Sequence, residues 1–185
     1  MKNLSEKDLE WIAVYDLGDS TLFVSNHANT DTMIITKKYN TNRTNPFYFN
    51  EADDDTYEAN AGYDYIIKQS NIWITGDLLI GAKYGSDSLE TIYSLKMRYS
   101  KRNIAKLDGD ILRPLQLRKF EYNGQIYDNC IIADSTNSGY STYRADVVNK
   151  VEKFVWSKEY GLIYYKFEDG EEFFREDLQP DSINL

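Results

Sequence analysis

Apolar and polar side chains alternate at every second residue along much of this chain, and this is the feature that most limits its fold. The segment 89–99 shows the pattern most clearly: large apolar side chains share one face, while Ser94, Lys96 and Arg98 occupy the other. Successive side chains of a β-strand point to opposite faces, so this segment is predicted to be a strand with one buried and one solvated side. Few stretches show the 3.6-residue period of a helix.

Turn residues separate the predicted strands at short intervals. Asn123-Gly124 can take positive φ at both central positions, as a type I′ hairpin turn requires, and Asp169-Gly170 carries the same signature. Gly161 predicts a further turn between strands at 151–156 and 162–167. The last quarter of the chain is therefore predicted to be a three-stranded meander.

Strand candidates also fill the first half of the chain. Residues 21–25 and 31–36 predict a hairpin around the turn-rich segment 26–29. Residues 72–75 and 78–80 look like two separate short strands because Gly76 lies between them.

The nine to eleven strand candidates do not alternate with helices, which argues against a parallel sheet. We expect a mainly β fold in one domain over 1–185: a single antiparallel meander sheet, strongly curved, forming a barrel or a sandwich. A capping-box pattern from Ser5 to Asp8 predicts a short N-terminal helix at about 5–12. Residues from about 178 to 185 are predicted to be a loose tail.

Charge and composition exclude several classes of protein. The formal net charge is −9 and the pI about 4.7, which argues against nucleic-acid binding. No run of ten apolar residues occurs, so no transmembrane segment is predicted.

The single cysteine, Cys130, excludes an intramolecular disulfide and is predicted to be a buried small hydrophobe. Residues 1–8 show no signal peptide, which leaves a cytoplasmic protein or a mature segment whose leader was removed.

Residue types for catalysis are few. The one histidine, His27, lies in a predicted turn and is predicted to be a surface residue, because its sequence neighbours do not form a triad. A calcium site formed by Asp53, Asp54 and Asp55 is an alternative to a solvated acidic loop, and no other cofactor is expected. The chain has 30 acidic residues, so paired carboxylates for glycosidic cleavage stay open as well.

Aromatic residues make up 15 % of the chain, including 16 tyrosines. Aromatic side chains form cross-strand pairs that stabilise large antiparallel sheets, and this is the favoured interpretation. The alternative is a sugar or lipid pocket, for which the candidate ligand-binding residues are Tyr63, Tyr65, Trp73 and Tyr93.

Two C-terminal motifs and an N-terminal segment carry a resemblance. The motifs are the hairpin Tyr122-Asn123-Gly124-Gln125-Ile126-Tyr127-Asp128-Asn129 and the segment Tyr160-Gly161-Leu162-Ile163-Tyr164-Tyr165, followed by Asp169-Gly170. Together with residues 9–32, they resemble small uncharacterised lipoproteins of Bacteroidetes. The resemblance implies a mature segment in the cell envelope, held by a lipid on a cysteine upstream of this sequence. The matching positions are turn and core residues, so no catalytic residue carries over.

The leading hypothesis is therefore a non-catalytic module of the cell envelope, periplasmic or at the surface, that binds or scaffolds a partner protein or a small hydrophobic or glycan ligand. The first alternative is a carrier that holds a hydrophobic ligand in a barrel-like cavity. The second alternative is a hydrolase that uses acidic residues. A large internal cavity would favour the carrier, and acids converging in a cleft would favour the hydrolase.

Overall fold

The computed structural model describes residues 4–41, 59–68, 73–84, 89–98, 100, 102–103, 116–136, 139–140 and 149–179. The helical elements lie near the two ends: α1 (Glu6–Leu9), η1 (Glu10–Ile12) and η2 (Glu176–Leu178). The strands are β1 (Ser20–Ser25), β2 (Thr30–Asn40), β3 (Asn60–Lys68), β4 (Trp73–Tyr84), β5 (Leu89–Met97), β6 (Arg102–Asn103), β7 (Arg118–Tyr122), β8 (Gln125–Ala133), β9 (Gly139–Tyr140), β10 (Val151–Ser157), β11 (Gly161–Phe167) and β12 (Glu172–Arg175).

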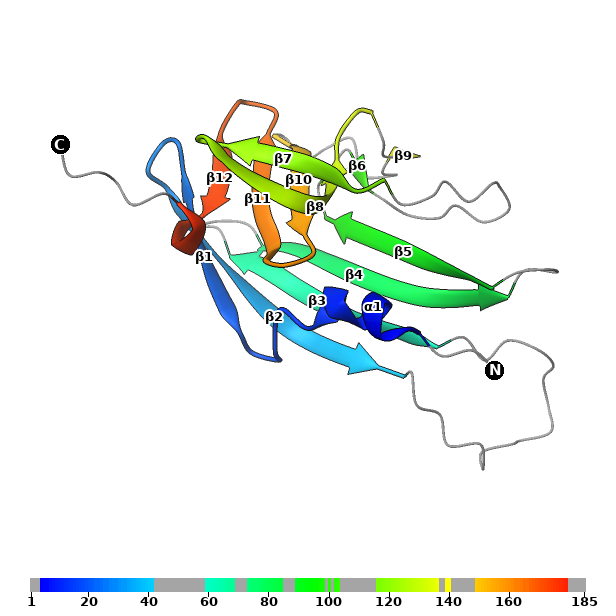
Figure 1. The fold of residues 1–185 in the computed structure, drawn as a ribbon. Coiled ribbons are helices and arrows are strands. Elements are labelled where there is room, and N and C mark those ends of the chain that lie inside the picture. The colour runs from blue at the N-terminus through cyan, green and yellow to red at the C-terminus, as the bar shows by residue number, and fades with distance from the viewer. Residues whose placement is uncertain are drawn as a thin grey trace.

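Ten of these strands form one antiparallel sheet in the order β5-β4-β3-β2-β1-β12-β11-β10-β8-β7, and β6 pairs with β9 beside it (Figure 1). The prediction of a mainly β, antiparallel fold is therefore confirmed. Strands β1 to β5 pair in chain order, and so do β10 to β12 and the β7–β8 hairpin. β10 pairs with β8, and β1 pairs with β12, which joins these groups into one sheet. In the described residues β5 does not pair with β7, so the sheet stays open there.

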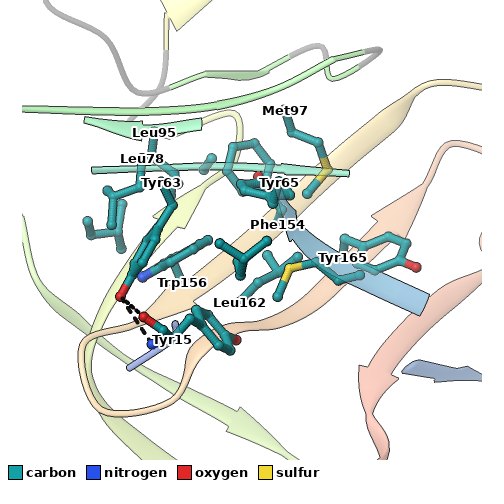
Figure 2. Close-up of a cluster of buried hydrophobic side chains, with 14 of the residues drawn as sticks. Tyr15, Tyr63, Tyr65, Leu78, Leu95, Met97, Phe154, Trp156, Leu162 and Tyr165 are labelled. Carbon is teal, nitrogen blue, oxygen red and sulfur yellow. Dashed lines mark hydrogen bonds between the residues drawn. The ribbon is translucent and has the colours of Figure 1, made fainter. Parts of the chain in front are cut away.

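The sheet bends back so that distant strands meet. Trp156 of β10 is fully buried, and its ring lies 5.7 Å from that of Tyr65 and 6.3 Å from that of Tyr63, both on β3 (Figure 2). Ser100, just beyond β5, forms an isolated bridge with Val151 at the start of β10. The apolar faces of β2–β5 and of β10–β12 thus share one core.

The C-terminal meander β10–β12 is buried on both faces. Its outer face carries Tyr164 and Phe174, and the β7–β8 hairpin covers them. Tyr122 of that hairpin stacks on Phe174 with ring centroids 4.3 Å apart and planes 15° apart. A bulge in β8, where Asn129 has a φ of 53°, interrupts the register with β7. Bulges increase local twist, which helps this hairpin to follow the curved meander.

Most of the predicted turns, and the predicted capping box, are confirmed. Asn123 and Gly124 both have positive φ, as a type I′ turn requires. Gly161 follows the turn after β10 as the first residue of β11 and has a φ of 77°. Ser5 and Asp8 form the predicted capping box, and the helix then tightens into a 3₁₀ turn that ends at Ile12. The hairpin predicted around 26–29 joins β1 to β2.

Four local predictions are corrected. Residues 73–75 and 78–80 belong to one strand, β4, which continues through Gly76; residue 72 lies outside the described part. The turn at Asp169-Gly170 is not type I′, because only Gly170 has positive φ and the loop spans 168–171. Ser94 is buried rather than solvated, with 6 % of its surface exposed. The predicted tail begins later than 178, because Leu178 is the last residue of η2; residues 180–185 lie outside the described part.

Gly76 shows why β4 is not interrupted. Tyr65 of β3 lies directly opposite Gly76 of β4, and the tyrosine ring occupies the space where a side chain at position 76 would lie. A Cβ atom on Gly76 would be 2.2 Å from that ring. The Tyr65 hydroxyl then donates a hydrogen bond of 3.1 Å to the carbonyl of Lys96 on β5. A glycine that weakens a strand in isolation is thus covered by a neighbouring aromatic ring.

Gly161 and Gly170 provide a matched pair of glycines for a stability test. Both have positive φ, but a Cβ at Gly161 would lie 2.3 Å from the Tyr15 ring, whereas Gly170 has open space around it. We expect Gly161→Ala to lower the free energy of unfolding by about 3 kcal/mol or more, because it adds a clash to backbone strain. Gly170→Ala should cost about 1 kcal/mol. Urea unfolding followed by circular dichroism measures both, and equal losses would contradict the predicted clash with Tyr15.

Candidate functional site

An open hollow lies on the outer face of strands β2 to β5, on the side of the sheet away from the core. Its volume is about 360 Å³. Its lining combines two carboxylates, two cations and two hydroxyls with Ile66 and parts of Tyr65 and Gly76; the polar members are Thr36, Asp64, Thr75, Asp77, Lys96 and Arg98. A ligand in this hollow would meet hydrogen-bond donors and acceptors of both charges.

The strand register brings these side chains together. Asp64 lies directly opposite Asp77 across β3 and β4, and Asp77 lies directly opposite Lys96 across β4 and β5. Directly opposed residues of antiparallel strands have Cβ atoms about 5 Å apart, so the three charged groups form one row across the sheet. Arg98 lies beside the row, and its backbone N–H donates to the carbonyl of Thr75 at 2.7 Å.

The surroundings of Asp77 in this row shift the pKa of its carboxyl group. Burial raises the pKa of Asp77 above its ordinary value of 3.8; Lys96 opposes this shift and Asp64 adds to it. Tyr39 of β2 lies on the same face of the sheet, and its pKa is raised to about 12 by burial and by the carboxylates of Asp64 and Asp77. The hollow therefore contains one carboxyl group with a raised pKa, Asp77, directly opposite a second carboxyl group, Asp64.

Trp73 is the predicted ligand-binding residue that stays accessible. It is 60 % exposed, and the ammonium of Lys68 lies 5.3 Å from its ring centre. Trp73 is two residues before Thr75 on β4 and on the same face, so it lies about 7 Å along the strand from the lining of the hollow.

The other three predicted ligand-binding residues serve the core. Tyr63 and Tyr65 are fully buried beside Trp156, and the Tyr63 hydroxyl donates to the carbonyl of Tyr15 at 3.1 Å (Figure 2). Tyr93 is half-buried and donates a 2.8 Å hydrogen bond to Asp8, which ties β5 to the N-terminal helix. The structure therefore does not gather the four aromatic residues into one pocket.

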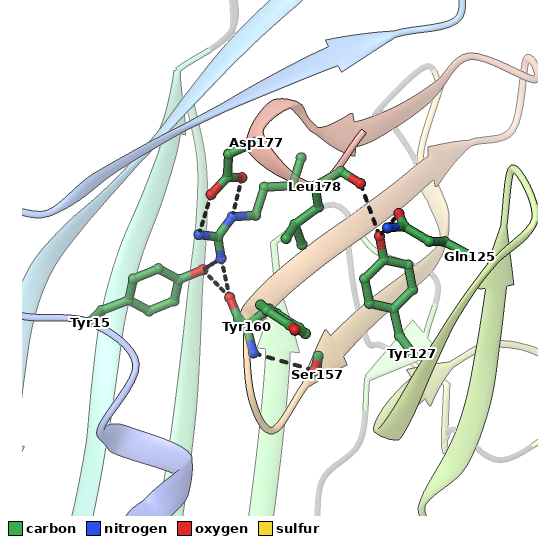
Figure 3. Close-up of polar contacts among 8 residues, drawn as sticks. Tyr15, Gln125, Tyr127, Ser157, Tyr160, Asp177 and Leu178 are labelled. Atoms are coloured by element: carbon green, nitrogen blue, oxygen red, sulfur yellow. Dashed lines mark hydrogen bonds and ion pairs between the residues drawn. The ribbon is translucent and has the colours of Figure 1, made fainter. Parts of the chain in front are cut away.

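A polar cluster around Arg175, at the end of β12, has a structural role (Figure 3). Arg175 forms a bidentate ion pair with Asp177 at 2.7 and 2.9 Å and also donates to Tyr15 and to the carbonyl of Tyr160. Nearby, the Tyr127 hydroxyl donates to the Leu178 carbonyl at 3.0 Å. These bonds join the N-terminal segment, the β10–β11 turn and η2, so the cluster stabilises the packing of these three segments. We call the group Tyr15, Tyr160, Arg175 and Asp177 the clasp.

The remaining predicted residues fall outside any site. Cys130 is fully buried, and burial raises the pKa of its thiol to about 11, which agrees with the prediction of a buried hydrophobe. His27 lies in the turn between β1 and β2, as predicted. Asp53, Asp54 and Asp55 lie outside the described residues. Within the described ranges, no three His, Cys, Asp or Glu side chains are grouped to hold a metal ion.

Comparisons with protein-family models, with curated proteins and with solved structures found no match to this chain. The resemblance to Bacteroidetes lipoproteins thus rests on the sequence motifs alone. Among the described residues, no helix has the length and hydrophobicity needed to cross a bilayer.

Asp77→Asn tests the electrostatic description of the hollow. A raised pKa in the folded state means that Asp77 contributes stability below its unfolded pKa, and that this contribution is lost as pH rises through the folded value. We expect the variant to be as stable as the parent, or up to about 1 kcal/mol more stable, at neutral pH. It should also flatten the dependence of stability on pH above pH ~4.

Asp128→Asn is the matched control for this measurement, because Asp128 is an exposed carboxylate that pairs with Lys119 on β7 at 3.2 Å. We expect its free energy of unfolding to change by less than about 0.5 kcal/mol. Urea unfolding at a series of pH values compares the two variants. A clear loss of stability in Asp77→Asn at neutral pH would show that its ionised form is stabilising instead.

Proposed function

We propose that this protein is a non-catalytic binding module of the cell envelope whose outer hollow holds a hydroxyl-rich ligand such as a glycan chain. The observation that carries the proposal is the row Asp64, Asp77 and Lys96 in an open hollow beside the exposed ring of Trp73. Sugar hydroxyls both donate and accept, so a lining with carboxylates, cations and threonine hydroxyls matches them. An exposed indole offers a flat apolar surface for the face of a sugar ring.

Affinity electrophoresis tests this function. The protein is run in native gels that contain a neutral glucan, a xylan or a galactomannan. We expect retardation in at least one gel, and a loss of affinity of about tenfold in Asp64→Asn, Lys96→Gln and Trp73→Ala, since each removes a direct contact. Asp128→Asn, far from the hollow, should bind like the parent. No retardation in any gel, or equal retardation of all variants, would contradict the proposal.

A hydrolase remains the second candidate because two carboxyl groups face each other at the hollow. Glycoside hydrolysis requires a carboxylic acid that donates a proton, and the raised pKa of Asp77, which lies directly opposite the carboxyl group of Asp64, suits that role. An assay for new reducing ends, run on the same polysaccharides, separates the two functions. Binding without new reducing ends supports the module, and release that stops in Asp77→Asn supports the enzyme.

The carrier alternative needs room inside the curved sheet. In the described residues this interior holds closely packed rings, among them Trp156, Tyr63 and Tyr65. We therefore expect a fluorescent fatty acid to show no saturable, one-to-one binding in a titration of the folded protein. Stoichiometric binding with a micromolar dissociation constant would instead favour the carrier.

The cell-envelope location is part of the proposal and has its own test. If the protein is a lipoprotein, the coding sequence upstream of Met1 contains an export leader that ends at a cysteine. A stop codon immediately upstream of Met1 would contradict this location. That result would leave the binding proposal intact, because the hollow does not depend on the anchor.

A further inference from the structure

The outer face of the C-terminal meander contains an amine with unusual surroundings. Lys153 of β10 is half-buried, and its ammonium lies 5.0 Å from the ring centre of Phe120 and 5.6 Å from that of Tyr164. Both rings belong to the second apolar cluster: Phe120 is on β7 of the β7–β8 hairpin, and Tyr164 of β11 lies beneath that hairpin. Within the described residues, Lys153 has no carboxylate at salt-bridge distance.

Cations lie on two sides of this amine. Lys166 of β11 is directly opposite Lys153 in the strand register, and like charges in that position repel each other. Arg118 of β7 is the second neighbouring cation. Both act against the charged form of the Lys153 side chain.

The nearest carboxylates are engaged with other groups. Asp134, at the end of β8, pairs with Arg118 at 2.9 Å. Glu172 of β12 lies opposite Lys166 and accepts a 2.7 Å hydrogen bond from the Tyr164 hydroxyl. These two acids still favour the charged amine from a distance, but burial together with Arg118 and Lys166 outweighs them, and the pKa of Lys153 is lowered.

We propose that Lys153 is a preferred acylation site of this protein, reacting with activated acyl donors such as anhydrides and thioesters faster than the exposed lysines do. The neutral amine attacks the acyl carbon and a C–N bond forms, the bond to the leaving group breaks so that a carboxylate or thiolate departs to solvent, and the amine nitrogen loses one proton to solvent. No oxidant, reductant or metal is required. The modification would remove a cation from the face that the β7–β8 hairpin covers.

Lysines elsewhere in the chain provide internal references. Lys119, on the same hairpin, has a side chain that is 76 % exposed and pairs with Asp128. Lys158 pairs with Glu10. Both lysines have a carboxylate at ion-pair distance, and Lys153 has none within the described residues, so we expect both to react more slowly than Lys153 near neutral pH although Lys119 is far more accessible.

Competitive labelling measures these reactivities on the intact chain. The folded protein receives trace acetic anhydride at pH values from about 6 to 10, and is then denatured, fully labelled with the deuterated reagent and analysed by mass spectrometry. Near neutral pH we expect Lys153 to react at least about threefold faster than Lys119, because a lower pKa increases the neutral fraction. The midpoint of its pH profile should lie below that of Lys119. A Lys153 rate equal to or below that of Lys119 would overturn the proposal.

Arg118→Gln tests the role of the neighbouring charges. The substitution removes a cation near Lys153 and removes the ion pair between Arg118 and Asp134, and both changes favour the protonated amine. We expect the Lys153 midpoint to move to higher pH and its rate near neutral pH to fall at least about threefold, while Lys119 is unchanged. Arg98→Gln, on the other half of the sheet, is the matched control and should leave Lys153 unchanged. An Arg118→Gln variant that is folded by circular dichroism and keeps the parental Lys153 profile would contradict the mechanism.

Discussion

The structure depends on the burial of strands β10, β11 and β12 on both faces. Trp156 and Phe173 point into the main core, while Tyr164 and Phe174 point to the opposite side beneath the β7–β8 hairpin. Large aromatic side chains bury much area and pack edge-to-face or offset, so a few of them can fill two interfaces. The meander thus acts as a central layer, and the abundance of tyrosine is explained by packing.

This layer also determines where a ligand can bind. Tyr15 reaches across the core to the β10–β11 turn, where its hydroxyl donates to the Tyr160 carbonyl at 3.0 Å, and Arg175 completes the clasp. The inner faces of β2–β5 and β10–β12 pack together, so the polar side chains that we propose to bind a ligand lie on the outer face of β2–β5. The row formed by Asp64, Asp77 and Lys96 is such a set.

The sequence predicted strands and turns well, because their signals are local. It could not predict which outward-facing strand positions are buried by other parts of the chain. Alternation identified β5, and Asn123-Gly124 fixed the β7–β8 turn, because both signals are local. Ser94 and Tyr164 were beyond such reasoning, since burial of an outward position depends on elements distant in the chain. The strand β4 was divided at Gly76 for the same reason: the ring that covers this glycine belongs to Tyr65 on another strand.

The candidate site also could not be predicted from residue types alone. Aromatic residue type alone selected Tyr63, Tyr65, Tyr93 and Trp73, yet each of the three hydroxyls has an acceptor within the protein. A buried tyrosine requires such a partner, so its hydroxyl is no sign of a ligand. The acids at the hollow were not singled out, because their significance lies in register: Asp64 and Asp77 are thirteen positions apart in sequence and directly opposite in the sheet. Residue type proposes chemistry, but strand pairing decides which groups can act together.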